Sequence, residues 1–406
     1  MRKKADDLPG LTYSRSNGFL QMLTQNSVQT PTSSEELHVS YRHHFPVTET
    51  LIYLNHAAVA PLCRPAAEAM KWLADDACLN GSLHYDKWMD SYEGLRVATA
   101  RLINALPSEI AIVKNTSEGI STIAMGLDWK AGDRVIAFKE EFPANYYPWQ
   151  RLASRGVEIT WLSIYDPLEK LAEALPGARL LAISFVNYLS GHRVDLKAIG
   201  ELCHQHGCFY FVDAIQGMGA FPLDVESCHI DALAADGHKW MLGPEGNGVL
   251  YVRKSRQDAI EPVEFGWTNP ANYADYSSRD MTLRPDAGRY ECGTLNTIGC
   301  FGQRASLELL LEAGIDNVSA AIWQRAHELA EGVQAKGYEL MLEHKRESGS
   351  GIVSFRHPVT DCRVIVSELK RNMITAAPRQ GWVRMSPHFY TSPDDIQQVL
   401  SALSAV

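Results

Sequence analysis

Short apolar segments alternate with segments of helical periodicity over the middle of the chain. Seven of the short segments are rich in β-branched and aromatic residues and predict strands at 109–114, 134–138, 157–164, 180–186, 209–212, 232–235 and 249–252. Helical patterns lie between most of them, and the pattern over 194–207 has a glycine where a helix should end. Strands that alternate with helices predict an α/β fold with a mainly parallel sheet flanked by helices.

The two ends of the chain have different patterns. Residues 1–50 are rich in Ser, Thr, Gln and Asn, which predicts an N-terminal arm. After a helical stretch at 301–336, strand patterns at 352–355 and 382–385 alternate with helical patterns at 362–371 and after Ser392, which can cap the last helix. We therefore predict three parts: the arm (1–50), a large domain with a seven-stranded sheet (51–295) and a small C-terminal α+β domain (296–406).

The composition is that of a soluble globular protein. Of 406 residues, 46% are apolar and 21% are charged, and 48 acidic against 38 basic residues give a net charge of −10. This balance argues against nucleic-acid binding, which needs a basic surface. No apolar run approaches the roughly 18 residues of a membrane-spanning helix, and no signal-peptide pattern is present. The eight cysteines form no CxxC pair, so we expect reduced thiols and a cytoplasmic enzyme.

Two polar residues follow neighbouring apolar segments and carry the candidate chemistry. Asp213 directly follows the segment at 209–212, and Lys239 follows the segment at 232–235 and precedes a loop rich in Gly and Pro. Open α/β sheets bind ligands at the carboxyl ends of their strands. Alone, such an aspartate is usually a turn former and such a lysine a solvated charge. Together they suit pyridoxal phosphate, because the amine can form a Schiff base and the carboxylate can keep the pyridinium nitrogen protonated.

The segment around this lysine also carries a family resemblance. Asp236-Gly237-His238-Lys239-Trp240-Met241-Leu242-Gly243-Pro244 resembles fold-type I pyridoxal phosphate enzymes of the class V aminotransferase family, most of all the isopenicillin N epimerase-like branch. Cysteine desulfurases belong to the same family. The resemblance begins at Tyr53 and continues past Arg384. It implies an enzyme that acts on a small-molecule amino acid without a metal, as a homodimer with sites at the interface.

The resemblance assigns a role to each matching residue. Lys239 and Asp213 resemble the family's catalytic pair, and other residues resemble its cofactor ligands: Thr116, Ser117 and His238 for the phosphate, Phe142 for ring stacking, Gln216 and Asn187 for the phenolic oxygen, and Thr294 for the phosphate of the partner subunit's cofactor. Many relatives have a histidine where this chain has Phe142. Arg384 resembles the arginine that binds the substrate α-carboxylate, with Asn187 and His56 also near the substrate.

Two departures from the desulfurase pattern affect the expected reaction. Desulfurases carry a nucleophilic cysteine shortly before the arginine that Arg384 resembles, whereas residues 375–381 contain none and Cys362 lies on the preceding predicted helix. Persulfide-forming chemistry on the enzyme is therefore disfavoured. Desulfurases also have a small hydroxyl residue at the position of Asp236. A carboxylate would repel the phosphate, so we expect Asp236 to turn away or to pair with His238.

Several reactions stay open at this point. With Lys239 as general base at the α-carbon, the outcome can be transamination, epimerisation or β-elimination of a substituent, as in a C–S lyase. An epimerase needs an acid on the opposite face, for which His56, Tyr147 and His388 are candidates. A nicotinamide-dependent oxidoreductase is disfavoured because no GxGxxG follows the first strand of the repeating unit. A non-catalytic scaffold is disfavoured because Lys239 and Asp213 are both present.

Overall fold

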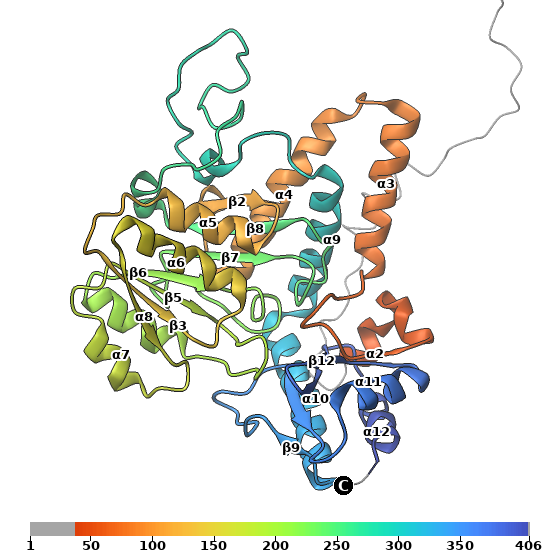
Figure 1. The fold of residues 1–406 in the computed structure, drawn as a ribbon. Helices are drawn as coiled ribbons and strands as arrows, with labels where there is room; N and C mark the ends of the chain where they lie inside the picture. The colour runs from red at the N-terminus through yellow and green to blue at the C-terminus, as the bar shows by residue number, and fades with distance from the viewer. Residues whose placement is uncertain (1–36, 405–406) are drawn as a thin grey trace, which may run out of the picture.

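The large domain is built on a seven-stranded sheet with the strand order β2-β8-β7-β6-β5-β3-β4. The computed structural model describes residues 37–404 (Figure 1). The seven segments predicted as strands form this sheet: β2 (Ile110–Val113), β3 (Arg134–Phe138), β4 (Glu158–Leu162), β5 (Leu180–Ser184), β6 (Phe209–Asp213), β7 (Ala232–Asp236) and β8 (Gly248–Val252). Strand β8 runs antiparallel to β2 and β7, and the other neighbours are parallel.

Both faces of this sheet are buried because successive side chains enter two different apolar layers. One layer contains α5 (Thr116–Gly126) and α6 (Tyr147–Arg151). The other contains α4 (Tyr85–Ile103), α7 (Leu168–Ala174), α8 (Leu196–Gln205) and α9 (Thr297–Ala313). The predicted fold class, an α/β domain with a mainly parallel seven-stranded sheet, is confirmed.

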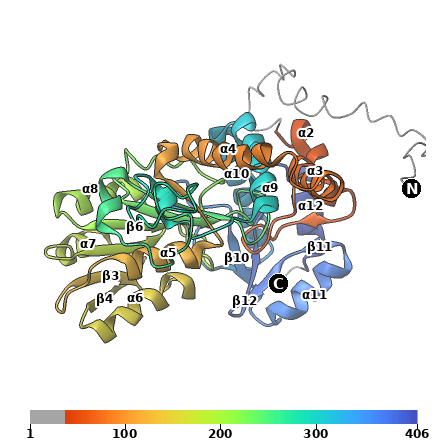
Figure 2. The ribbon, with the colours of Figure 1, turned by 90° about the horizontal axis from the view of Figure 1, so that it is seen from above.

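The C-terminal part is a smaller α+β unit beside the sheet (Figures 1 and 2). Its antiparallel sheet has the order β12-β13-β10-β9, made of β9 (Glu339–Leu340), β10 (Val353–Arg356), β12 (Ala377–Arg379) and β13 (Trp382–Met385). It packs against α10 (Ile315–Ala335), α11 (Cys362–Arg371) and α12 (Pro393–Ala402) around its own apolar core. Ser392 caps α12 as predicted, with its side chain accepting from the N–H of Asp395.

The segment that precedes the large domain packs onto this small unit. Most of the predicted arm, residues 1–36, lies outside the described residues. The rest begins with α2 (Leu37–Tyr41), after which Arg42 forms an ion pair with Asp395 on α12. Phe45 stacks on Tyr390 with ring centroids 3.6 Å apart. Strand β1 (Ile52–Tyr53) then pairs in parallel with β11 (Ile374–Thr375), before α3 (Arg64–Asn80) packs on α9. No helix within residues 37–404 is long and apolar enough to cross a membrane.

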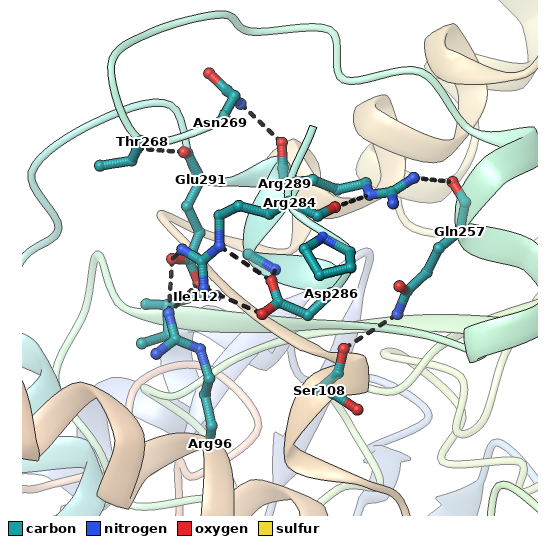
Figure 3. Close-up of polar contacts among 12 residues, drawn as sticks. Arg96, Ser108, Ile112, Gln257, Thr268, Asn269, Arg284, Asp286, Arg289 and Glu291 are labelled. Atoms are coloured by element: carbon teal, nitrogen blue, oxygen red, sulfur yellow. Dashed lines mark hydrogen bonds and ion pairs between the residues drawn. The ribbon is translucent and has the colours of Figure 1, made fainter. Parts of the chain in front are cut away.

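A buried ion pair fastens the segment between β8 and α9 to the large domain (Figure 3). Nη2 of Arg96, on α4, lies 2.6 Å from both carboxylate oxygens of Glu291. The same carboxylate accepts a hydrogen bond from the backbone N–H of Ile112 in β2 (2.9 Å), and Arg284 approaches it to 3.8 Å. The hydroxyl of Thr268 donates to the Glu291 carbonyl oxygen. Glu291 therefore connects the segment between β8 and α9 to α4 through Arg96 and to β2 through Ile112, and its carbonyl oxygen binds Thr268 of the same segment.

Removal of this buried carboxylate is expected to destabilise the fold. In Glu291→Ala, the Arg96 guanidinium stays buried without its main counter-charge, so the free energy of unfolding should fall by roughly 3–5 kcal/mol in urea unfolding. Glu93 also contacts Arg96, but its side chain is 68% exposed against 3% for Glu291. Glu93→Ala is the matched control and should cost less than about 1 kcal/mol. Equal losses in the two variants would contradict this role for the buried pair.

Candidate active site

Lys239 lies in a tight turn that follows β7. The N–H of Gly237 donates to the carbonyl oxygen of Asn247 (2.9 Å). The N–H of Gly243 donates to the carbonyl oxygen of Gly237 (2.9 Å). A side chain at Gly237 would place its Cβ 1.8 Å from Oε1 of Gln303, so the buried Gln303 side chain would have to move to admit it. These contacts fix the backbone that carries Lys239 at the carboxyl edge of the sheet.

The Lys239 amine is held in a form that can react at neutral pH. Burial lowers the pKa of Lys239 to about 8, against the opposing charges of Asp213 and Asp236 and with the help of Arg384 and Arg379. A substantial fraction of the amine is therefore neutral and nucleophilic near pH 7.5. Its Nζ lies 5.8 Å from the centroid of the Phe142 ring, which is the aromatic side chain that the sequence assigned to this site.

Asp213 ends β6 and is buried beside this lysine. Burial raises the pKa of Asp213 to about 6, while a hydrogen bond from the N–H of Ile215 and the charge of Lys239 lower it. The carboxylate is therefore mainly ionised at pH 7 and buried, so it can hold a proton on a ligand's ring nitrogen.

A second buried carboxyl group, Glu141, lies close to Asp213 and was not singled out from the sequence. Its Oε1 accepts from the N–H of Ser184 (2.6 Å) and its Oε2 from the Ser184 hydroxyl, and Ser184 pairs with Asp213 in the sheet. Burial raises the pKa of Glu141 to about 8, and the Asp213 charge adds to this. The only signal in the sequence is its position just after β3, at the same sheet edge.

The N-terminus of α5 supplies a place for an anion. Asn115 caps the helix by accepting from the N–H of Glu118 (2.9 Å), and Ser117 is exposed in the first turn. The Thr116 hydroxyl accepts from the N–H of Asp236 (2.9 Å), which leaves that hydroxyl able to donate. Free hydroxyl and amide donors at the positive end of a helix suit a phosphate group.

Asp236 and His238 meet next to this helix end. Oδ1 of Asp236 and Nδ1 of His238 are 3.1 Å apart, but the geometry is not that of a hydrogen bond, so both atoms are buried without a hydrogen-bond partner. The expected pairing of Asp236 with His238 is therefore present as a close approach without a hydrogen bond. Two unsatisfied polar atoms at this point indicate a site that is completed by a bound group.

Arg384 reaches the site from β13 of the small unit. Its Nη1 donates to the carbonyl oxygen of Tyr188 (2.6 Å), while its Nε is buried without a hydrogen-bond partner. Burial lowers the pKa of Arg384 to about 10, and the charge of Arg379 contributes, so the guanidinium stays positive at neutral pH. A buried cation with a free donor suits a carboxylate ligand.

The side-chain amides of Gln216 and Asn187 are already engaged within the chain. Gln216 donates to the carbonyl oxygen of Ala57 (3.0 Å) and accepts from the indole N–H of Trp240 (2.9 Å). Asn187 donates to the carbonyl oxygen of Glu140 (2.8 Å) and accepts from the loop that follows it. Each amide keeps one N–H for a ligand, so the predicted contacts with the cofactor stay predictions.

The predicted contact of His56 with a substrate finds no support in its surroundings. His56 is buried, with Nδ1 2.7 Å from the carbonyl oxygen of Ser386 and Nε2 2.6 Å from the hydroxyl of Tyr390. Burial lowers the pKa of His56 to about 4, so the ring is neutral. Both ring nitrogens are engaged, and the residue holds two loops together.

Thr294 is exposed on the segment before α9. The cofactor phosphate that it is predicted to contact would have to belong to another subunit.

These residues together fit pyridoxal phosphate. The structure brings Lys239, Asp213, Phe142, His238 and Arg384 to one sheet edge, with the α5 N-terminus beside Asp236. They offer an amine for the aldehyde, a carboxylate for the ring nitrogen, an aromatic ring and a helix end for the phosphate.

Comparisons with known proteins agree with this site. A family model described as Aminotransferase class-V matches residues 52–399. A probable cysteine desulfurase of Pyrococcus abyssi is 29% identical over 386 residues, which cover 89% of this chain and 96% of that protein. The apo structure of a cysteine desulfurase from Thermococcus onnurineus NA1 has a TM-score of 0.83 at 26% identity, covering 93% of this chain and 98% of that one.

The cystine C–S lyase C-DES is similar to the same extent. A C-DES variant with glycine covalently linked to its PLP cofactor has a TM-score of 0.83 at 25% identity, covering 89% of this chain and 98% of that one. The complex of C-DES with its product cysteine persulfide has a TM-score of 0.81 at 26% identity, covering 88% and 98%. The family model spans the strands, the Lys239 turn and β13, so the chain belongs to the aminotransferase class-V family and is a pyridoxal phosphate enzyme.

Proposed function

We propose that this enzyme is a C–S lyase that eliminates the sulfur substituent from the β-carbon of an amino acid. The observation that carries this proposal is the turn between β12 and β13, next to Arg384. The turn consists of Gln380 and Gly381, β12 ends at Arg379, and residues 375–381 contain no thiol. Cys362 is buried in the core of the small unit and is not available as a nucleophile. Sulfur must then leave on the substrate's own fragment, as in the C-DES complex with cysteine persulfide.

The residues of the site can perform this elimination. Arg384 binds the α-carboxylate and so fixes the α-carbon near Lys239. The neutral amine of Lys239 removes the α-proton, while ionised Asp213 keeps a proton on the ring nitrogen of the cofactor. When bound, pyridoxal phosphate supplies the electron sink that makes the α-proton acidic. The Cα–H and Cβ–S bonds break, sulfur leaves with the electron pair, and water converts the remaining fragment to pyruvate and ammonia.

Epimerisation is less well supported by the geometry. It needs an acid on the face opposite Lys239, and the sequence offered three candidates. His56 and His388 are buried with both ring nitrogens in hydrogen bonds, and Tyr147 is 64% exposed. The isopenicillin N epimerase-like branch therefore stays a prediction from the sequence, and so does transamination, which uses the same residues as elimination.

We also infer that the enzyme works as a homodimer. The segment between β8 and α9 exposes Thr294 together with the aromatic side chains of Phe265, Trp267 and Tyr276. Such side chains are suited to a subunit interface, across which Thr294 would reach the phosphate of the partner's cofactor. The division into residues 1–50, 51–295 and 296–406 and the cytoplasmic location rest on the sequence and stay predictions.

A covalent link between Lys239 and the cofactor is the first expectation to check. Wild-type protein should be yellow, and borohydride should bleach it and attach the cofactor to the peptide that contains residue 239, as read by mass spectrometry. Lys239→Ala should lose this attachment. Lys345→Ala, which removes an exposed lysine paired with Glu343, should behave as wild type. Cofactor attached elsewhere, or a colourless wild type even with added pyridoxal phosphate, would exclude the proposal.

The pH dependence of cofactor capture follows from the lowered pKa of Lys239. Since only the neutral amine attacks the aldehyde, the rate at which cofactor-free protein takes up pyridoxal phosphate should rise with pH and level off above about pH 8. An ordinary lysine in a model peptide should keep rising to about pH 10. Stopped-flow absorbance measures both. If the rate for the protein keeps rising to about pH 10, as for the peptide, burial does not lower the pKa of Lys239.

The proposed elimination should not depend on any accessible thiol. Among the eight free cysteines, Cys78 is exposed and Cys228 and Cys292 are half-buried. The triple variant Cys78→Ala, Cys228→Ala, Cys292→Ala should keep kcat/KM for pyruvate release from L-cystine within about twofold of wild type. A loss of activity with the cofactor still bound would indicate that sulfur passes through an enzyme thiol, as in a desulfurase.

A further inference from the structure

The segment after β5 forms a short hairpin from Val186 to Arg193, which we call the Tyr188 hairpin after the residue near its tip. A β-bridge between Val186 and Arg193 closes its base. The N–H of Gly191 donates to the carbonyl oxygen of Asn187 (3.0 Å), and this bond closes its tip. Both ends of the hairpin are thus held by its own backbone, so an anchor at the base also fixes the backbone of Tyr188.

Arg193 anchors the base of the Tyr188 hairpin to the small unit. Its backbone N–H donates to the carbonyl oxygen of Ser348 (2.8 Å). Its Nε donates to the carbonyl oxygen of Gly349 (3.1 Å), and its Nη2 donates to the carbonyl oxygens of Arg346 (2.9 Å) and Glu347 (3.3 Å). These four acceptors belong to consecutive residues between β9 and β10, so a single arginine binds a whole turn of the small unit.

The guanidinium of Arg193 is half-buried between the two units. Among the described residues, all of its hydrogen bonds go to backbone carbonyl oxygens of the small unit. Its Cζ also lies 4.9 Å from the ring centroid of Phe221, in the large domain. Hydrogen bonds from a charged donor are stronger than those from a neutral donor. Arg193 is therefore a strong non-covalent link between the large domain and the small unit.

Gly191 shows how closely the Tyr188 hairpin approaches the small unit. Its φ is +74°, which favours glycine, and a Cβ at this position would lie 2.5 Å from the carbonyl oxygen of Ile352. The same Cβ would lie 2.9 Å from the hydroxyl oxygen of Ser350. The hairpin is therefore packed directly against the segment that Arg193 binds, as well as being hydrogen-bonded to it.

The contacts of this hairpin lead directly to Arg384. The hydroxyl of Ser354 donates to the carbonyl oxygen of Leu189, and Ser354 lies opposite Arg384 in the antiparallel pair of β10 and β13. The carbonyl oxygen of Tyr188 accepts from Nη1 of Arg384 (2.6 Å), whose Nε is buried without a hydrogen-bond partner. The position of the hairpin therefore sets the direction in which the free Nε of Arg384 points.

We propose that Arg193 is a positioning residue that orients Arg384 towards the α-carboxylate of the substrate. It acts through the Tyr188 hairpin, whose carbonyl oxygen holds one end of the Arg384 guanidinium. An arginine binds a carboxylate well only when its planar fork is held in the right orientation, so a loosened hairpin weakens carboxylate binding. This inference rests on the proposed role of Arg384 as the ligand of the α-carboxylate.

Two ligands that differ in one group test this role in the holoenzyme. Glycine carries a carboxylate, and glycinamide has a neutral amide in its place. The absorbance of the bound cofactor gives the dissociation constant of each ligand. Wild type should prefer glycine, Arg384→Gln should lose this preference, and Arg193→Gln should reduce it about tenfold. Arg193→Lys should recover part of the preference, because it keeps the charge but not the fork.

The kinetics of pyruvate release from L-cystine provide a second readout. In Arg193→Gln, KM should rise about tenfold while kcat stays within about threefold of wild type, because the residues that move the proton are unchanged. Ser354→Ala removes the hydrogen bond to Leu189 without removing a charge. It should weaken the preference for glycine and raise KM about two- to threefold, so it tests the proposal even if Arg193→Gln does not fold.

Arg346→Gln is the matched control. The exposed guanidinium of Arg346 lies 4.5 Å from the ring centroid of Trp323, and Arg193 binds its backbone carbonyl, which this variant keeps. The preference for glycine should stay as in wild type. If Arg193→Gln has a lower unfolding midpoint but an unchanged preference, the role of Arg193 is purely structural. If it binds glycine and glycinamide equally more weakly, the whole site has loosened. Either result overturns the proposal.

The binding measurement separates this proposal from the proposed reaction. If the preference depends on Arg193 but no sulfur amino acid releases pyruvate, the lyase assignment fails while the positioning role stands. If pyruvate is released but Arg193→Gln keeps the full preference, the positioning role fails alone. If wild type itself shows no preference for glycine, Arg384 does not bind the carboxylate and the positioning role fails with it.

Discussion

The arrangement of this enzyme depends on a lysine and an aspartate buried together at the carboxyl ends of two neighbouring strands. Burial alone would neutralise both groups, because a charge loses its hydration in the protein interior. Their mutual attraction opposes that effect, so the pKa of Lys239 falls only to about 8 and the pKa of Asp213 rises only to about 6. At neutral pH this leaves a lysine that can react and a carboxylate that stays charged, which is what the chemistry of an amino acid α-carbon requires.

Segments from both ends of the described chain meet around that pair. Arg384 belongs to the small unit and faces the large domain, where Tyr188 accepts its hydrogen bond. His56, in the loop after β1, connects to Ser386 and Tyr390 in the loop after β13, so its buried neutral ring joins segments from opposite ends of the chain. A residue that the sequence placed near the substrate thus holds the frame around the site.

Differences within one short hairpin can redirect the chemistry of a shared scaffold. The fold is similar in cysteine desulfurases and in a cystine C–S lyase, at 25–29% identity to this chain. Residues 375–381, which include β12 and the turn before β13, contain no cysteine that could act as the nucleophile of desulfurase chemistry. In the proposed elimination, the sulfur therefore leaves on the substrate's own fragment.

Sequence periodicity determined the seven strands, the helices that flank them and the cap at Ser392, because these features depend on local apolar patterns and local hydrogen bonds. Spacing also identified Lys239 and Asp213, since parallel strands end at the same edge of a sheet. It did not predict that β11 pairs with β1, that Glu141 lies beside Asp213, or that His56 has no free nitrogen. Those features depend on contacts between residues far apart in the chain. The orientation of Arg384 towards the site was likewise decided by the register of β13 on β10 and β12 and by the carbonyl oxygen of Tyr188, because a one-residue shift would turn the side chain to the other face.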